Sequence, residues 1–242
     1  MFSFTVNGSE DLVTLTNGIA LITSGVQIPL MEKEEGVIGR IFTFDFNSPA
    51  DGATEVTIKG DLNRETFSPL GITAYEQRST ETVTVFVINR KKGEPAVEVF
   101  DFKQEQNLLT HKKTIKSNNI YTPNNIAATG PNTFYLTNDG YSDWLPIRIV
   151  ELLMLIPGGR VVYYDGTEVR PVTGRLLTPN GVALSHTRNI SKIREILAGW
   201  NKTKNDEVGT TLQQGLISCV IFAQGYIKKL CNFITPSNFL SS

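Results

Sequence analysis

Short apolar runs dominate the chain as far as residue 185, and large hydrophobic residues alternate with polar or small ones within them. Residues 40–46 read R-I-F-T-F-D-F and residues 82–89 read T-V-T-V-F-V-I-N. An alternation with a period of two over about four to eight residues is typical of half-buried β-strands rather than of helices. Glycine, asparagine and proline separate the runs, as they do in turns between strands. The pattern predicts an all-β fold.

One six-residue phrase returns along the chain at a nearly constant step. T-P-N-N-I-A at 122–127 is echoed by L-T-N-G-I-A at 15–20, S-P-L-G-I-T at 68–73 and T-P-N-G-V-A at 178–183. The third positions of the phrases are Asn17, Leu70, Asn124 and Asn180, so the steps are 53, 54 and 56 residues. A period near ~50 residues, with up to four strand-like runs per unit, indicates the blades of a β-propeller.

The repeated third position has two interpretations. If the innermost strand of each blade begins at a central channel, the four side chains line one opening. Alternatively, asparagine and glycine simply form turns here, because both tolerate a positive backbone φ angle. The turn is the favoured interpretation for a single asparagine such as Asn17. Both interpretations stay open for Asn124 and Asn180, which follow Thr-Pro at equivalent places.

Two segments depart from the strand pattern. Between two prolines, residues 144–159 place Ile149, Leu152, Leu153 and Ile156 at helical spacing, which predicts a short amphipathic helix. This helix covers one end of the propeller, walls a substrate site or contacts a membrane surface. Residues 186–200 also read as a helix, with Ile193, Ile196 and Leu197 on one face. We therefore expect a partial propeller at 1–185 and a divergent, partly helical tail at 186–242.

Composition narrows the class of protein. The chain has 242 residues, 40% of them hydrophobic, and a net charge of −1. There is no basic run that would neutralise nucleic-acid phosphates, so no nucleic-acid partner is expected. No apolar run reaches the length of a membrane span, and no signal peptide is visible at the start of the sequence.

Some sites have several interpretations. The two cysteines, Cys219 and Cys231, form either a local disulfide or two buried free thiols. Sequons make Asn7, Asn189 and Asn201 candidate glycosylation sites.

Side-chain oxygens supply the candidate chemistry. Glu10 and Asp11 are adjacent, and neighbours on a strand point to opposite faces, so the two acids can serve two different sites. Together with Asn124, Asn125 and Asn180 they offer oxygen ligands without sulfur or imidazole. Such a set suits calcium, which takes six to eight oxygen ligands.

Other chemistries are disfavoured. Zinc is disfavoured because the only histidines, His111 and His186, stand in unrelated contexts. The sequence has no G-x-S-x-G elbow, P-loop or dinucleotide-binding motif. A hydrolase built on a serine triad is therefore not expected, whereas a metal-centred one is compatible with the sequence.

Five ordered motifs carry a resemblance to a known family. They are G-S-E-D-L-V-T-L-T-N-G-I-A-L-I-T-S-G (8–25), F-S-P-L-G-I-T (67–73), T-P-N-N-I-A-A-T-G (122–130), F-Y-L-T-N-D (134–139) and V-V-Y-Y-D-G-T-E-V-R (161–170). Over residues 8–185 the chain resembles the serum paraoxonase/arylesterase family. The resemblance implies a secreted six-bladed β-propeller with two calcium ions in its channel, which hydrolyses small aryl esters and lactones.

The resemblance also implies a ligand set. Glu10, Asn124 and Asn180 match ligands of a catalytic calcium, and Asp11, the carbonyl of Ile72 and Asn125 match ligands of a structural calcium. The catalytic ion would act as a Lewis acid on the ester or lactone carbonyl and hold the developing oxyanion. A general base would activate water, and the family usually assigns this role to a histidine pair. Asp139 is a candidate to hold one of these metal ligands in place without binding the ion itself.

The chain departs from the family at several of these places. Leu70 and Arg90 stand where the histidines are expected, and neither is a base near neutral pH. Asn125 stands where the family has Asp, which removes a negative charge from the structural site. No convincing match to the family's next Asp-Asn ligand pair follows Ser185, so about three to four blades are expected.

Three interpretations of the chain follow from this comparison with the family. The chain is a calcium-dependent arylesterase/lactonase with weak or absent activity, a non-catalytic relative that serves as a binding or chaperone-like module, or a truncated fragment.

Overall fold

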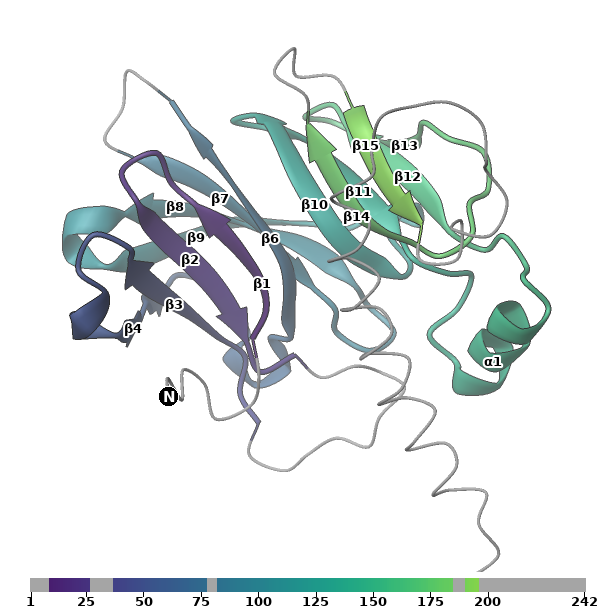
Figure 1. The fold of residues 1–242 in the computed structure, drawn as a ribbon, viewed down its shortest axis with the longest axis horizontal. Coiled ribbons are helices and arrows are strands. Elements are labelled where there is room, and N and C mark those ends of the chain that lie inside the picture. Colours follow the sequence, from purple (N-terminus) through teal and green to yellow (C-terminus); the bar gives the residue numbers. More distant parts are fainter. Residues whose placement is uncertain (1–8, 27–36, 78–81, 185–189, 196–242) are drawn as a thin grey trace, which may run out of the picture. The chain divides into compact units, whose positions relative to one another are not determined.

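The computed structural model describes residues 9–26, 37–77, 82–184 and 190–195 (Figure 1). The chain divides into two compact units, Met1–Leu197 and Ala198–Ser242, and every described residue belongs to the first. Strands in several sheets dominate this unit. The all-β prediction is confirmed, whereas a six-bladed ring stays a prediction. Asn7, Asn189, Asn201, His186, Cys219 and Cys231 lie outside the described residues.

The first sheet is a four-stranded antiparallel meander. Its strands, in spatial and sequence order, are β1 (Ser9–Thr14), β2 (Ile19–Ser24), β3 (Arg40–Asp45) and β4 (Ala53–Glu55). β3 lies where the alternating pattern predicts a strand, and its Ile41 is fully buried. Gly18 closes the turn between β1 and β2 with φ of 89°, a value that glycine adopts without a steric cost.

The second sheet is larger because one strand joins it from outside the meander. Its antiparallel strands are β6 (Pro69–Glu76), β7 (Val83–Asn89), β8 (Ala96–Lys103) and β9 (Leu108–Ile115). The short β5 (Thr57–Lys59) pairs with β9 in parallel. Three single-turn 3₁₀ helices are η1 (Pro49–Asp51), η2 (Arg64–Thr66) and η3 (Gln104–Gln106).

The third sheet carries the predicted helix as an insertion. Its strands are β10 (Pro123–Gly130), β11 (Thr133–Asn138), β12 (Arg160–Tyr164) and β13 (Val169–Pro171). Between β11 and β12 lies α1 (Leu145–Leu153), with Pro146 in its first turn, where the missing N–H of proline costs no hydrogen bond. The helix prediction for this segment is confirmed. None of the described helices is long and apolar enough to cross a membrane.

The last described sheet corrects a prediction. β14 (Pro179–Leu184) pairs with β15 (Ile190–Glu195) in an antiparallel hairpin. The helix expected at 186–200 is therefore wrong over residues 190–195. A run of apolar and charged residues fits helical and strand spacing almost equally over so short a span. Val182 pairs with Ile193, so a neighbouring strand edge supplies the hydrogen bonds that decide the conformation.

Two apolar cores hold neighbouring sheets together. Phe67, Val85 and Phe100 of the second sheet region pack in one cluster with Leu21 and Ile41 of the first sheet. Residues from the opposite face of the second sheet pack against the third sheet, and they include Leu70, Phe86, Ile88, Phe134, Leu136 and Val162. Burying each large apolar side chain stabilises the fold by about 1.5–3 kcal/mol. The second sheet is thus covered on both faces, which explains its continuous buried run at Val85–Asn89.

Each sheet has an edge strand that opens its antiparallel part; these four first strands are β1, β6, β10 and β14, and each lies beside the next. β6 contacts β1 on one side and β10 on the other, and β10 contacts β14. Gly71 permits this approach, because a Cβ there would lie 2.7 Å from the backbone oxygen of Asn124. Farther along, the Ala128 N–H donates to Thr73 Oγ1 at 3.2 Å. The partner in β10 advances from Asn124 to Ala128 as β6 advances from Gly71 to Thr73, so β6 and β10 run in the same direction.

Candidate functional site

Each of the four first strands begins with the same irregularity. The strand register shifts between Ser9 and Leu12, between Pro69 and Ile72, between Pro123 and Asn125, and between Pro179 and Gly181. Such β-bulges re-aim side chains and are common beside functional sites. The second residues of the strands, which fall within these bulges, are Glu10, Leu70, Asn124 and Asn180.

This register corrects the place of Asn17. The strand of the first sheet that lies beside β6 is β1, so Glu10 and not Asn17 occupies the position equivalent to Asn124. Asn17 lies in the exposed turn between β1 and β2, and its Oδ1 accepts a hydrogen bond from the Ile19 N–H at 3.2 Å. The turn interpretation is therefore correct for Asn17. The phrase around it is an echo in sequence without an equivalent place in the fold.

Three of the four equivalent side chains carry oxygens without a hydrogen-bond donor in the described part of the chain. Glu10 is exposed, and no described residue bonds to its carboxylate. Asn124 Nδ2 donates to Asp139 Oδ2 at 3.3 Å, which leaves Asn124 Oδ1 facing elsewhere. The Asn180 backbone carbonyl accepts from Thr137 Oγ1 at 2.9 Å, whereas its side chain bonds to no described residue. These oxygens are available to a ligand.

The charge of Glu10 depends on its surroundings. Although the side chain reaches solvent, the protein around it removes much of its water, and this desolvation raises the pKa of Glu10. The neighbouring Asp11 carboxylate raises the pKa further, and the positive charge of Arg90 lowers it. The net effect is an increase. A carboxylate in this condition gains from a nearby cation.

Leu70 occupies the remaining position and belongs to the apolar core. Its side chain is 3% exposed and packs in the cluster shared by the second and third sheets. Its backbone carbonyl accepts a hydrogen bond from Thr23 Oγ1 at 2.7 Å, and its side chain has no polar atom. The residue therefore contributes no proton-transfer group, as expected from its chemistry.

Arg90 is locked into a buried ion cluster. Its guanidinium makes a bidentate contact with Asp139, at 3.1 and 3.3 Å, and a second ion pair with Asp143 at 2.6 Å. Burial alone would lower the pKa of Arg90, but Asp139 and Asp143 raise it overall. Burial likewise would raise the pKa of Asp139, but Arg90 and then Arg148 lower it overall. Arg90 therefore stays protonated and cannot accept a proton.

The same cluster ties α1 to the site. Arg148 Nη1 donates to the backbone carbonyl of Asp139 at 2.8 Å and lies 3.4 Å from Glu151 Oε2. Glu151 Oε1 accepts a hydrogen bond from the Tyr141 N–H at 2.6 Å. Gly140 is required, because a Cβ there would overlap the Arg148 guanidinium. Arg148 and Glu151 were not identified from the sequence as residues that anchor α1. Two opposite charges three residues apart in an otherwise apolar helix would have been the signal.

Asp11 and Asn125 form a second group, in which their side chains bond to each other and to backbone N–H groups. Asp11 Oδ2 accepts hydrogen bonds from the Ile72 N–H at 3.0 Å and from Asn125 Nδ2 at 3.1 Å. Asp11 Oδ1 accepts from the Leu12 N–H at 2.9 Å. Asn125 Oδ1 accepts from the Val182 N–H at 3.1 Å. Burial raises the pKa of Asp11, and the Ile72 and Leu12 N–H groups oppose that rise.

Hydrogen bonds join Asp11, Ile72 and Asn125 of the second proposed ligand set. Glu10, Asn124 and Asn180 of the first set share an equivalent register position on β1, β10 and β14. In the described part of the chain no three or more His, Cys, Asp or Glu residues form a metal-binding group. Glu10, Asn124 and Asn180 form a different kind of set, with one carboxylate and two carboxamides. His111 lies in a separate place, where its Nε2 contacts Glu98 Oε2 at 2.9 Å within the second sheet.

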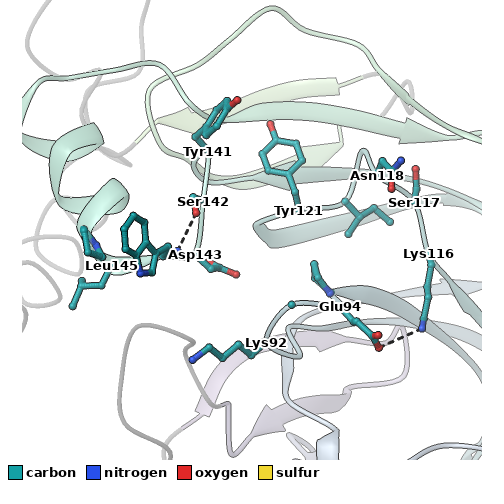
Figure 2. A pocket seen from close by; sticks show the side chains of 15 residues that line it. Lys92, Glu94, Lys116, Ser117, Asn118, Tyr121, Tyr141, Ser142, Asp143 and Leu145 are labelled. Carbon is teal, nitrogen blue, oxygen red and sulfur yellow. Dashed lines mark hydrogen bonds and ion pairs between the residues drawn. The ribbon is translucent and has the colours of Figure 1, made fainter.

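A cavity of about 940 Å³ opens next to the ion cluster (Figure 2). Asp143, which pairs with Arg90, is one of its lining residues. Lys92 and Glu94 lie on one side of the cavity, and Tyr121 and Tyr141 lie on the other. The cavity therefore presents aromatic rings and charged groups beside the candidate site.

Comparison with known proteins decides the family. The sequence model of the family described as Arylesterase matches residues 4–211. This chain belongs to the arylesterase family. Serum paraoxonase/arylesterase 2 of Gallus gallus is 33% identical to it over 207 residues, which cover 81% of this chain and 58% of that protein. Serum paraoxonase/lactonase 3 of Oryctolagus cuniculus is 33% identical over 180 residues, covering 74% of this chain and 51% of that protein.

These relatives confirm the resemblance drawn from the five motifs. They also set its extent, because this arylesterase-family chain spans about half the length of the curated relatives it matches. Among solved structures, an α-L-arabinofuranosidase of Fusarium graminearum aligns with a TM-score of 0.40 and 11% identity, over 72% of this chain and 51% of that one. A likeness at that level bears on neither the fold nor the function.

Proposed function

We propose that this chain carries an ester- and lactone-hydrolysing site at the start of its first strands, with one calcium ion held by Glu10, Asn124 and Asn180. One observation carries the proposal: these three residues occupy the same bulged register position on β1, β10 and β14. Their side-chain oxygens have no donor among the described residues. One carboxylate and two carboxamides form the hard oxygen set that calcium prefers. The names of the relatives identify arylesterases and a lactonase.

When bound there, calcium would supply Lewis-acid polarisation of an ester or lactone carbonyl and stabilise its developing negative charge. The chain's own residues prepare the site. Asp139 holds Asn124 Nδ2, so the amide oxygen is fixed on the other side. Arg90 and Arg148 neutralise Asp139, which keeps that carboxylate ionised and able to hold the amide.

The same geometry limits turnover. Hydrolysis requires a base that takes a proton from the attacking water, and such a base accelerates a reaction by about 10²–10⁴-fold. Leu70 has no titrating group, and Arg90 remains protonated between Asp139 and Asp143. We therefore expect turnover roughly 10²–10⁴-fold below that of an enzyme of the same kind with a base in place.

The experiment is an initial-rate assay with phenyl acetate and a δ-lactone, in excess calcium and then in excess chelator. The unmodified chain should show a slow, calcium-dependent rate. Glu10→Gln should lose that rate, and Glu105→Gln, a matched change in exposed η3, should keep it. A rate that ignores calcium, or that survives in Glu10→Gln, would refute the proposed site.

A non-catalytic binding module is the second candidate, and the ion-paired state of Arg90 favours it. In that case calcium stabilises the chain, but neither ester is hydrolysed above the rate in buffer. The cavity beside Asp143 would then bind a ligand without turning it over. The same assays distinguish the two candidates, because a weak hydrolase shows a calcium-dependent rate above that in buffer and a pure binding module does not.

We also propose a lipid surface as a partner of α1. The segment that contains the helix exposes large apolar side chains, among them Trp144 at 64%, Leu153 at 77% and Met154 at 70%. Aromatic and aliphatic groups of this kind insert at the boundary between headgroups and acyl chains. Sedimentation with phosphatidylcholine vesicles should retain the chain, and Leu153→Asp should release it. Equal retention of both forms would contradict this partner.

An extracellular location is proposed because the relatives are named as serum proteins. Glycans at Asn7, Asn189 or Asn201 would accompany that location. A mass decrease after treatment with an N-glycosidase would support both statements, and a protein without glycans found only in cell lysates would contradict them.

A further inference from the structure

The Asp11 carboxylate lies where the first strands of four sheets meet. Asp11 itself belongs to β1, and its Oδ2 accepts hydrogen bonds from the Ile72 N–H of β6 and from Asn125 Nδ2 of β10. The same Asn125 side chain accepts from the Val182 N–H of β14. A continuous chain of three hydrogen bonds, each 3.0–3.1 Å long, therefore joins all four strands.

The Asn125 amide fits this junction in only one orientation. The Val182 N–H is a donor, so the amide atom that faces it must be the oxygen. The Asp11 carboxylate accepts only, so the amide atom that faces it must be the nitrogen. Turning the amide over would place two donors against each other at Val182 and two oxygens against each other at Asp11. The hydrogen-bond network thus assigns the amide.

We propose that the Asn125 amide does at this junction what a divalent cation does elsewhere, so that the four strands are held here without metal. Two N–H groups already point at Asp11 Oδ2, and their partial positive charge repels a cation from that oxygen. This differs from the expectation drawn from the family resemblance, which places a structural calcium at these residues. The junction is closed by donors on this chain.

A single change should reopen the junction to metal. In Asn125→Asp, one carboxylate oxygen still accepts from the Val182 N–H. The other oxygen replaces the amide nitrogen and faces the Asp11 carboxylate. Two carboxylates that face each other repel, and a divalent cation between them removes the repulsion.

The test is a count of calcium ions by isothermal titration calorimetry on the full chain and three variants. The unmodified chain should bind one ion, Glu10→Gln none, Asn125→Asp two, and the double variant Glu10→Gln with Asn125→Asp one. The count for the unmodified chain rests on the proposed function. The gain of one ion on Asn125→Asp does not, so the two ideas fail separately.

Thermal unfolding gives an independent readout. Asn125→Asp in the Glu10→Gln background should melt about 5–10 °C higher at calcium a hundred times its dissociation constant. The Glu10→Gln chain itself should show no shift. A folded Asn125→Asp chain that gains no ion relative to its own background would overturn the proposal. Calcium that remains bound to Glu10→Gln counts against the proposed function, and it counts against the junction without metal only if Asp11→Asn removes it.

Asp11→Asn covers the case in which Asn125→Asp fails to fold. An asparagine here still accepts from the Ile72 and Asn125 N–H groups through its oxygen but lacks the charge. The count of calcium ions should be unchanged relative to the unmodified chain. The loss of one ion would mean that Asp11 is a metal ligand, and the proposal would be wrong.

Discussion

Glu10 and Asp11 are neighbours in the sequence, as are Asn124 and Asn125. In each pair, one side chain has an oxygen without a hydrogen-bond donor in the described part of the chain, and each polar atom of the other side chain is hydrogen-bonded. The side-chain oxygens of Glu10 and Asn124 accept no hydrogen bond from the described residues. The Asn124 amide nitrogen donates to Asp139. Asp11 and Asn125 bond to each other and accept hydrogen bonds from three backbone N–H groups. One set of oxygens is open to a ligand, and the other is already saturated.

The difference teaches that the residue types alone do not define a calcium site. Both sets contain one carboxylate and at least one carboxamide. What separates them is the direction of the nearby donors: the Ile72 and Val182 N–H groups point into the second set. An ion competes poorly with hydrogen bonds that are already made, because it must first break them.

Removing Asp139 should disturb the open set most strongly. Asp139→Ala leaves Arg90 and Arg148 buried with fewer countercharges, and it removes the acceptor for Asn124 Nδ2. Breaking a buried ion pair from one side costs about 3–5 kcal/mol of unfolding free energy. Urea unfolding in chelator measures the change. The matched control is Asp101→Asn, which breaks the exposed pair with Lys112 and should cost less than about 1 kcal/mol.

A comparable loss in Asp139→Ala and Asp101→Asn would show that the cluster adds nothing beyond an ordinary surface pair. A large loss with calcium response intact would show that Asp139 stabilises the fold without positioning Asn124. Only a large loss together with weakened calcium binding supports both roles.

Calcium should stabilise the chain through the open set alone. Binding to the folded state raises the unfolding free energy by about 2.7 kcal/mol at a hundredfold excess over the dissociation constant. Thermal unfolding in calcium and in chelator measures this effect. Glu10→Gln should abolish the calcium-dependent rise, and Asn125→Ala should keep it while lowering stability in both conditions by about 1–3 kcal/mol.

The opposite pattern would reverse the comparison. If Asn125→Ala abolished the response and Glu10→Gln retained it, the saturated set would be the one that binds metal.

The sequence predicts the strands and the α1 insertion, and it singles out Asn124 and Asn180 as candidate ligands, because each leaves a local signal. Alternation marks β3, helical spacing between prolines marks α1, and the Thr-Pro-Asn phrase marks Asn124 and Asn180. The equivalence of Glu10 with these asparagines is not local. It depends on β-bulges at the starts of four separate strands, which no single stretch of sequence encodes.

The hydrogen bonds that close the second set escape sequence reasoning for a related reason. They join residues 61, 114 and 57 positions apart, so their direction exists only after the strands have come together. The β14–β15 hairpin shows the same limit, since pairing with β14 and not the spacing within residues 190–195 makes that segment a strand.

The smallest expected effect separates the two sets in the absence of metal. A carboxyl group with a raised folded pKa costs nothing below its ordinary pKa, near ~4.3 for Glu, because it is protonated in both states. As pH rises from that value to the higher folded pKa, Glu10 ionises in the unfolded state but stays protonated in the folded state, so stability is lost across this window and levels off above the folded pKa. In chelator at neutral pH, Glu10→Gln should therefore melt slightly higher than the unmodified chain, by roughly 1–2 °C, and the difference should vanish near pH 4.

In calcium the order of the two melting temperatures should invert, because the unmodified chain gains a ligand that the variant cannot hold. A Glu10→Gln chain that melts lower in both conditions would mean that the Glu10 carboxylate is satisfied within the fold and is not held open for an ion.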